Sequence, residues 1–307
     1  MDSSTKCIRI GTRGSLLART QTDLIVTALQ DLYPNLTLQI TILKTSGDIH
    51  QDVPFNQVGT KGMFVKEIEQ ALLSGEIDLG VHSLKDMPSE LPEGLQLSCT
   101  PEREDPRDAL VSACGLPLAM LPLHAVVGTS SLRRKAQIRA FRPDIEVKDL
   151  RGNLDTRLRK LTEGDYTAIV LASAGLHRLG LRQKITEYLP VNLCLPAVGQ
   201  GALALETRTD DLSTISLLAP LHHLETALAV NAERAFLHRL EGGCSVPAGA
   251  YAQIVGQEIY ITGILANIDG SIVRKAQEKG SIHDSESLGI RLAERLLEMA
   301  GGSLPKG

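Results

Sequence analysis

The chain has 307 residues, of which 43% are hydrophobic and 22% charged, and its formal net charge is −4. This length predicts two or three domains, and the composition is typical of a soluble globular protein. A negative net charge and only 3% aromatic residues argue against a nucleic-acid-binding surface. No apolar run reaches the roughly 20 residues that a membrane-spanning helix needs.

The N-terminus lacks the apolar core of a secretory signal, and the five cysteines form no Cys-x-x-Cys pair. We therefore expect no membrane partner, no disulfide framework and a reducing compartment. The cytoplasm fits this expectation, as does a plastid stroma if a transit peptide has been removed.

Short apolar runs alternate with longer amphipathic runs through the first two thirds of the chain, which is typical of an α/β fold with mostly parallel sheets. The first set of predicted elements comprises strands at 8–11, 36–45 and 77–83 and helices at 16–32 and 63–73. After a polar, proline-bearing segment at 101–108, the second set comprises strands at 125–129, 145–150 and 168–172, with helices after the first two. Ser130 or Ser131 and then Asn153 are the expected helix caps.

A second proline- and glycine-bearing crossing at 190–201 leads to a strand at 202–206 that we expect to return to the first lobe. Beyond residue 221 the pattern predicts a helix at 224–240, strands at 249–255, 258–266 and 271–278, and a closing helix at 285–299. Asp269-Gly270 is a hairpin signal.

These elements predict two hinged α/β lobes, like those of periplasmic binding proteins, and a small α+β C-terminal domain. The expected boundaries are 1–102 with 198–220 for domain 1, 103–197 for domain 2 and 221–307 for domain 3. The likeness to binding proteins is an analogy of fold, and it indicates a ligand in the cleft between the lobes.

Arginine and small polar residues recur where a strand gives way to a helix. The three turns are Gly11-Thr-Arg-Gly-Ser15, Gly128-Thr-Ser-Ser-Leu-Arg-Arg134 and Leu150-Arg-Gly-Asn-Leu-Asp-Thr-Arg157. Backbone N–H groups at a helix start favour an anion, and guanidinium groups add forked donors. An ordinary capped surface helix would explain each turn alone, but the three together favour an anion site.

Two further segments carry reactive groups. In His82-Ser-Leu-Lys-Asp86, Asp86 could serve as an acid/base and Lys85 could pair with an anion, although a capped loop with a surface Lys-Asp pair also fits. Cys244 lies between Gly243 and Ser245, so its thiol is either accessible or an inert buried group. We interpret the other four cysteines as packing residues and His82 as a structural histidine.

No phosphate-binding loop, dinucleotide-binding fingerprint, metal-spaced His/Cys cluster or nucleophile elbow is present, so nucleotide, flavin and metal chemistry lack support.

The chain resembles the porphobilinogen deaminase family, also called hydroxymethylbilane synthases, over nearly its whole length. The motifs that carry the resemblance occur in order: Thr12-Arg-Gly-Ser15, Lys61-Gly-Met-Phe-Val-Lys-Glu67, His82-Ser-Leu-Lys-Asp-Met-Pro88, Gly128-Thr-Ser-Ser-Leu-Arg-Arg134, Arg151-Gly-Asn-Leu-Asp-Thr-Arg157, Ala174-Gly-Leu-His-Arg178, Gly199-Gln-Gly201 and Gly242-Gly-Cys-Ser-Val-Pro247. Some positions vary within these motifs, and Asp155 adds a negative charge near an anion site.

The resemblance implies a transferase of tetrapyrrole biosynthesis that acts as a monomer on porphobilinogen. It implies a dipyrromethane cofactor held by a thioether on Cys244, four head-to-tail condensations with loss of ammonia, and hydrolytic release of hydroxymethylbilane. Asp86 matches the catalytic aspartate, which stabilises a cationic methylene-pyrrolenine and shuttles protons.

The resemblance also implies the binding residues. Those assigned to the cofactor are Lys85, Ser131, Arg133, Arg134, Arg151 and Arg157. Those assigned to substrate carboxylates are Arg13, Ser15 and Arg178, and Lys61 belongs to a loop over the cleft. Fixed guanidinium groups suit this task because buried carboxylates need charged partners.

Two other functions remain open. A non-enzymatic bilobal anion-binding protein would explain the arginines and the hinges, but it leaves Cys244 and Asp86 without a role. A nucleic-acid-binding protein would need a continuous basic face, which the net charge argues against.

Overall fold

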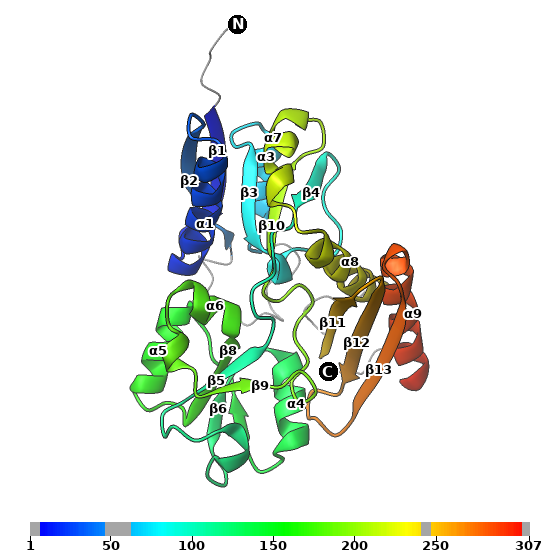
Figure 1. The fold of residues 1–307 in the computed structure, drawn as a ribbon. Helices are drawn as coiled ribbons and strands as arrows, with labels where there is room; N and C mark the ends of the chain where they lie inside the picture. Colours follow the sequence, from blue (N-terminus) through cyan, green and yellow to red (C-terminus); the bar gives the residue numbers. More distant parts are fainter. Residues whose placement is uncertain (1–6, 47–62, 241–246, 303–307) are drawn as a thin grey trace, which may run out of the picture. The chain divides into compact units, whose positions relative to one another are not determined.

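The computed structural model describes residues 7–46, 63–240 and 247–302 (Figure 1). By its contacts the chain divides into two compact units. Of the described residues, 7–46, 63–103 and 202–227 form the first unit, and 104–201, 228–240 and 247–302 form the second. No helix among the described residues is both long and apolar enough to cross a membrane.

The first unit is built on a five-stranded sheet in the order β2-β1-β3-β10-β4. Its strands are β1 (Cys7–Arg13), β2 (Thr37–Leu43), β3 (Leu79–Ser83), β4 (Leu95–Cys99) and β10 (Leu203–Arg208). Helices α1 (Leu16–Leu32) and α7 (Leu212–Leu218) contribute to the apolar core on one face, and α3 (Lys66–Leu73) contributes to a second apolar cluster. Strand β10 joins this sheet across a long stretch of sequence, as the sequence predicted.

The second unit contains another five-stranded sheet, in the order β7-β6-β8-β5-β9. Its strands are β5 (Asp108–Ser112), β6 (Val126–Gly128), β7 (Glu146–Lys148), β8 (Ala168–Ala172) and β9 (Glu187–Leu189). Its helices are α4 (Leu132–Phe141), α5 (Leu154–Thr162) and α6 (Ser173–Arg178).

The C-terminal part of the second unit is the α+β domain that the sequence predicted. Strands β11 (Ala248–Val255), β12 (Glu258–Ala266) and β13 (Val273–Ser281) form an antiparallel meander. Its apolar core is shared with α8 (Leu224–Arg239) and α9 (Ser285–Met299), and Phe236 of α8 is fully buried there. Gly270 has a φ of +77° in the turn between β12 and β13, which explains the glycine in the hairpin signal.

Short single turns of 3-10 helix complete the described chain: η1 (Leu84–Asp86), η2 (Leu118–Met120), η3 (Arg182–Lys184), η4 (Ala219–Leu221) and η6 (Ile282–Asp284).

The α/β class and the expectation of mostly parallel sheets are confirmed, because four of the five strands in each five-stranded sheet run in the same direction. In each five-stranded sheet the parallel pairs are accompanied by antiparallel ones, made by β10 in the first unit and by β5 in the second. The sequence analysis missed β4, β5 and β9, because strands of three to five residues carry too little periodicity to stand out. The interpretation of Cys7 and Cys114 as packing residues was also wrong, since both are exposed.

Three ionisable side chains are buried together in the first unit. Glu206 of β10 pairs in register with Gly80 of β3, and the missing side chain of Gly80 leaves room for the ring of His82. The His82 Nε2 atom lies 3.0 Å from Glu206 Oε2, and neither side chain is more than 2% exposed. Glu69 of α3 is also buried. Burial, and then the charges of Glu206 and Glu67, raises the pKa of Glu69 to about 7.

This raised pKa predicts a pH-dependent stability that Glu69→Gln abolishes. Between about pH 4.5 and pH 7 the folded protein keeps a proton that the unfolded chain has lost, so ionisable Glu69 lowers stability as the pH rises. Above pH 7 we expect Glu69→Gln to be more stable than the parent by ~1 kcal/mol, with little difference at pH 4.

Urea unfolding curves across this pH range measure the difference. The matched control is Glu76→Gln, because Glu76 is exposed at the end of the same helical region. A constant difference between Glu69→Gln and the parent at every pH would contradict the prediction.

Candidate active site

The first unit presents its predicted site residues at the carboxyl ends of two neighbouring parallel strands. Strand β1 ends at Arg13, and Ser15 is the N-cap of α1. Strand β3 ends at Ser83 and leads into η1, which contains Lys85 and Asp86. Because β1 and β3 are parallel neighbours, their carboxyl ends meet at one edge of the sheet.

The turn that carries Asp86 is fixed by its backbone. The buried residue Leu84 donates its N–H to the carbonyl of Ala202 at 3.0 Å, and Met87 N–H donates to the Leu84 carbonyl at 3.0 Å. Lys85 is exposed and Asp86 is half-buried. The carboxylate of Asp86 is therefore carried by a turn that is pinned to the sheet.

Two predicted ligand serines also cap helices. Ser15 Oγ accepts from Ala18 N–H at 3.3 Å, and Ser131 Oγ accepts from Arg134 N–H at 3.5 Å. In each case the hydroxyl oxygen serves as the acceptor, so its own O–H is left to donate. A serine in this position can cap the helix and still bind an anion at the helix start.

The turns after β6 and β7 are tied together by Ser130. Its Oγ donates to the Leu150 carbonyl at 2.9 Å and lies 3.1 Å from Leu150 N, whose N–H it accepts. Since β6 and β7 are parallel neighbours, Ser131 and Arg151 are brought to one edge of the second sheet. The structure thus joins two of the three predicted anion turns, and the third, Gly11–Ser15, belongs to the first unit.

Gly152 shapes the turn after β7. Its φ is +103°, and a Cβ atom there would lie 2.7 Å from Thr156 Cγ2. The Gly152 carbonyl accepts a hydrogen bond from Arg157 Nε at 2.8 Å, so the Arg157 side chain folds back over the turn. Asp155, which adds a negative charge near this predicted anion site, is exposed to solvent.

Arg178 ends α6, the helix after β8. Its Nη2 atom donates to the Gly201 carbonyl at 2.6 Å. Burial lowers the pKa of Arg178 to about 10, so its guanidinium remains charged at neutral pH. Gly201 has a φ of +92°, and a Cβ there would lie 2.3 Å from the Glu104 carbonyl oxygen, which makes glycine necessary.

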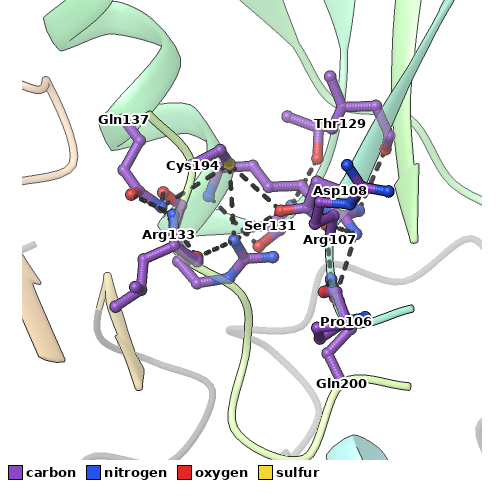
Figure 2. Close-up of polar contacts among 12 residues, drawn as sticks. Pro106, Arg107, Asp108, Thr129, Ser131, Arg133, Gln137, Cys194 and Gln200 are labelled. Atoms are coloured by element: carbon purple, nitrogen blue, oxygen red, sulfur yellow. Dashed lines mark hydrogen bonds and ion pairs between the residues drawn. The ribbon is translucent and has the colours of Figure 1, made fainter. Parts of the chain in front are cut away.

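Arg133 and Arg134 are consecutive residues in the first turn of α4, and both bind the carboxylate of Asp108. Figure 2 shows Asp108 and Arg133 within this cluster of polar contacts. Arg133 Nη1 is 2.7 Å from Asp108 Oδ2, and Arg134 Nη2 is 2.6 Å from Asp108 Oδ1. The exposed fraction of each arginine is 5% or less, and Asp108 is fully buried. Burial alone would raise the pKa of Asp108, but the two guanidinium charges outweigh it and hold that pKa far below its usual range.

The charges in this cluster do not balance. Among the described residues, Asp108 is the one carboxylate that faces these two buried guanidinium groups. Arg133 Nε is also buried and has no hydrogen-bond partner in that part of the chain. A buried excess of positive charge is costly unless an anion completes it, so the residues fit a carboxylate-bearing cofactor.

Cys244 and Lys61 lie outside the described residues, so their predicted roles as tether and loop residue stay predictions. No group of at least three His, Cys, Asp or Glu side chains suited to a metal occurs in the described ranges.

The chain matches two models of known protein families. Residues 8–216 match the porphobilinogen deaminase dipyrromethane cofactor-binding domain, and residues 227–298 match the C-terminal domain of the same family. The chain belongs to the porphobilinogen deaminase family. It therefore carries the family's dipyrromethane cofactor-binding domain and belongs with the enzymes of tetrapyrrole synthesis.

Relatives of known name agree with this assignment. The porphobilinogen deaminase of Geobacter sulfurreducens is 52% identical over 294 residues, covering 96% of this chain and 92% of the relative. That of Roseiflexus sp. strain RS-1 is 52% identical over 298 residues, covering 97% and 98%.

Solved structures with a similar fold are far more distant in sequence. The BenM effector-binding domain with benzoate is 17% identical, with a TM-score of 0.44 over 71% of this chain and 91% of that domain. The aliphatic sulphonate binding protein SsuA of Escherichia coli is 15% identical, with a TM-score of 0.42 over 75% of this chain and 70% of SsuA.

Sequence reasoning missed Asp108, Cys194 and Gln200 as members of the buried cluster around Arg133 and Arg134. Asp108 stands at the end of a polar stretch, where a solvated carboxylate is the default expectation. The available signal was the pair of adjacent arginines, because two buried guanidinium groups require a carboxylate somewhere in the fold.

The turn between β7 and α5, which carries Arg151 and Gly152, allows a test of whether it requires glycine at position 152. Gly152→Ala should lower the free energy of unfolding by about 2 kcal/mol, because it adds a contact with Thr156 to the cost of a positive φ. Gly164→Ala is the matched control, because Gly164 has a φ of +91° but open space around its Cβ position.

We expect Gly164→Ala to cost about 1 kcal/mol, from the backbone conformation alone. Denaturant unfolding of both variants measures the difference. Equal losses would mean that the Thr156 contact relaxes without cost.

Proposed function

We propose that this chain is a hydroxymethylbilane synthase, a transferase that joins four porphobilinogen molecules head to tail with loss of ammonia. The growing chain is attached to a dipyrromethane primer on Cys244, and hydrolysis releases hydroxymethylbilane. The observation that carries the proposal is the buried, charge-unbalanced pair Arg133 and Arg134 at a sheet edge. Membership of the family supports the reaction.

The substrate explains why so many fixed cations are needed. Each porphobilinogen brings an acetate and a propionate, so the negative charge grows with every condensation. We assign Lys85, Ser131, Arg133, Arg134, Arg151 and Arg157 to cofactor carboxylates and Arg13, Ser15 and Arg178 to substrate carboxylates. Forked guanidinium donors hold a carboxylate in one orientation, which suits a reaction that must place ring against ring.

Arg178 and Arg13 are suited to bind incoming charge in different ways. Arg178 is half-buried and anchored to Gly201, so its orientation is set before a ligand arrives. Arg13 stacks over the ring of Phe64 with its Cζ 4.2 Å from the ring centroid. This stacking restricts the motion of the guanidinium and so favours one orientation for a carboxylate ligand.

Asp86 is the proposed catalytic residue. Loss of ammonia from porphobilinogen leaves a cationic methylene-pyrrolenine, and a carboxylate beside the pyrrole N–H groups stabilises that cation. The same carboxylate can take up the proton released after the new carbon–carbon bond forms. The pinned η1 turn supports this role, because it fixes the position of the carboxylate relative to the sheet.

When bound, the dipyrromethane group would supply the free pyrrole α-carbon for the first condensation, and the ring added last would supply it for each later one. The proposed contribution of Cys244 is a covalent tether that persists between turnovers, and Lys61 is assigned to the loop over the cleft. We further propose a cytoplasmic monomer. The free thiols of Cys7, Cys99, Cys114 and Cys194 support a reducing compartment, and the monomer rests on the family resemblance.

The decisive experiment is the denatured intact mass of the full-length protein beside that of Cys244→Ser. We expect the parent to exceed its sequence mass by two linked pyrrole units, and the variant to lack this addition. A parent that stays unmodified after incubation with porphobilinogen would overturn the proposal and favour a reversible anion-binding protein.

Replacing the catalytic carboxylate should separate chemistry from binding. Asp86→Ala should fold and carry the primer, yet lose turnover by a factor of about 1,000, because a charged general acid/base is removed. Glu93→Gln, which neutralises an exposed carboxylate in the same unit, should keep parental turnover. Hydroxymethylbilane formation measures both, and near-normal activity in Asp86→Ala would remove Asp86 from the mechanism.

A further inference from the structure

Asp108 occupies a special place in the second sheet. It is the first residue of β5 and pairs in register with Ala172, the last residue of β8. Strands β6 and β8 are parallel, so Asp108 lies at the edge where they end and where the turn to α4 begins. Its carboxylate is fully buried beneath that edge.

Five donors converge on this one carboxylate (Figure 2). Oδ1 accepts from Arg134 Nε at 2.9 Å, Arg134 Nη2 at 2.6 Å and Gln200 Nε2 at 2.9 Å. Oδ2 accepts from Arg133 Nη1 at 2.7 Å and the Cys194 thiol at 3.2 Å. A carboxylate offers about four lone-pair directions, so Asp108 is saturated.

Each guanidinium has a second anchor in the backbone. Arg134 Nη1 donates to the Val170 carbonyl of β8 at 3.1 Å. Arg133 Nη1 donates to the Leu195 carbonyl at 2.5 Å, and Gln137 holds the same carbonyl at 3.2 Å. With Asp108 on one side and a carbonyl on the other, neither side chain is left to rotate freely.

Arg133 also contacts the start of the C-terminal sheet. A Cβ atom on Gly249 of β11 would lie 2.7 Å from Arg133 Cδ and 2.6 Å from the Pro196 carbonyl oxygen. The stem of Arg133 is therefore enclosed between α4 and β11. Asp108 holds Arg133, and Arg133 in turn holds the first turn of α4 against β11.

We propose that Asp108 is a positioning residue: it orients Arg133 and Arg134 for the cofactor carboxylates before those carboxylates arrive. This inference rests on the proposed function, which assigns both arginines to the cofactor. Orientation in advance lowers the entropy that each long side chain would lose on binding. A purely structural ion pair would need one arginine, whereas two leave the positive charge that a ligand carboxylate completes.

Asp108→Glu is the primary test, because it keeps the buried negative charge and moves the carboxylate by one methylene. Full-length protein is produced in a host that makes no porphobilinogen, and loading is followed by intact mass over a range of porphobilinogen concentrations. We expect the half-saturating concentration for loading to rise at least ~10-fold, with a maximal rate within about 3-fold of the parent. An unchanged half-saturating concentration would overturn the proposal, whatever the change in thermal midpoint.

The control is Asp144→Glu. Asp144 pairs with Arg142 in the same manner, at 2.7 Å and 2.6 Å, but it precedes β7 and so lies away from the carboxyl edge. This control should load like the parent. A similar loading defect in both variants would assign the effect to general destabilisation and would overturn a positioning role.

A double-mutant cycle with Arg134→Lys tests whether Asp108 acts through Arg134. If it does, Asp108→Glu should raise the half-saturating concentration by less than about 2-fold in the Arg134→Lys background. An additive, undiminished effect would contradict this route.

A measurement on the apoprotein, without any ligand, tests the positioning role independently of the proposed function. The Arg134 Nε–H proton should exchange slowly with solvent in the apoprotein and at least ~10-fold faster in Asp108→Glu, as followed by NMR. Equal exchange rates would overturn positioning even in a loaded enzyme. A parent that shows the protected proton but never gains the dipyrromethane mass would instead refute the proposed function.

Discussion

Two guanidinium groups buried beside one carboxylate are the constraint on which the second unit depends. Burying a charge requires a partner, and Arg133 and Arg134 share Asp108. That sharing draws together the start of β5, the first turn of α4 and the segment that contains Cys194 and Gln200. The resulting site has its hydrogen bonds largely satisfied and its charge unbalanced, which is the electrostatic character expected of a site for a polyanion.

The two units meet the same demand with the same local design. In the first unit β1 ends at Arg13 and Ser15 caps α1, and in the second Ser131 caps α4, whose first turn carries Arg133 and Arg134. Glycines with positive φ, such as Gly152 and Gly201, let the backbone turn sharply and present carbonyl groups to arginine side chains. Backbone carbonyl groups, as well as the Asp108 carboxylate, therefore hold the arginine side chains in place. A neutral carbonyl leaves the positive charge of the guanidinium available to an anionic ligand.

The first unit also buries ionisable side chains, but these are acidic groups and a histidine instead of arginines. His82 of β3, the strand that leads to Asp86, lies beside Glu206 of the neighbouring strand β10, and Glu69 is protonated more readily than an exposed glutamate. The first unit therefore buries, close to the strand that leads to Asp86, one carboxyl group whose protonation changes near neutral pH. The arginine pair leaves an excess of positive charge. Here the neighbouring charges are negative, and Glu69 avoids adding to them by keeping its proton up to about pH 7.

The sequence alone determined the α/β class, the return of β10 to the first sheet and the C-terminal meander, and it supplied the list of proposed site residues. It could do so because apolar periodicity, caps and ordered motifs are local signals. Arg133, Arg134 and Ser131 were identified in this way, and Ser131 does cap α4.

Only the tertiary structure decided which strands are antiparallel and that Asp108 lies under the two arginines. Strand β5 pairs with β8 and β9, about 60 to 80 residues away in sequence, and those pairings bury a carboxylate that its polar neighbours had made look solvated. Burial of this kind depends on contacts between distant segments, and a single sequence carries no local pattern for them.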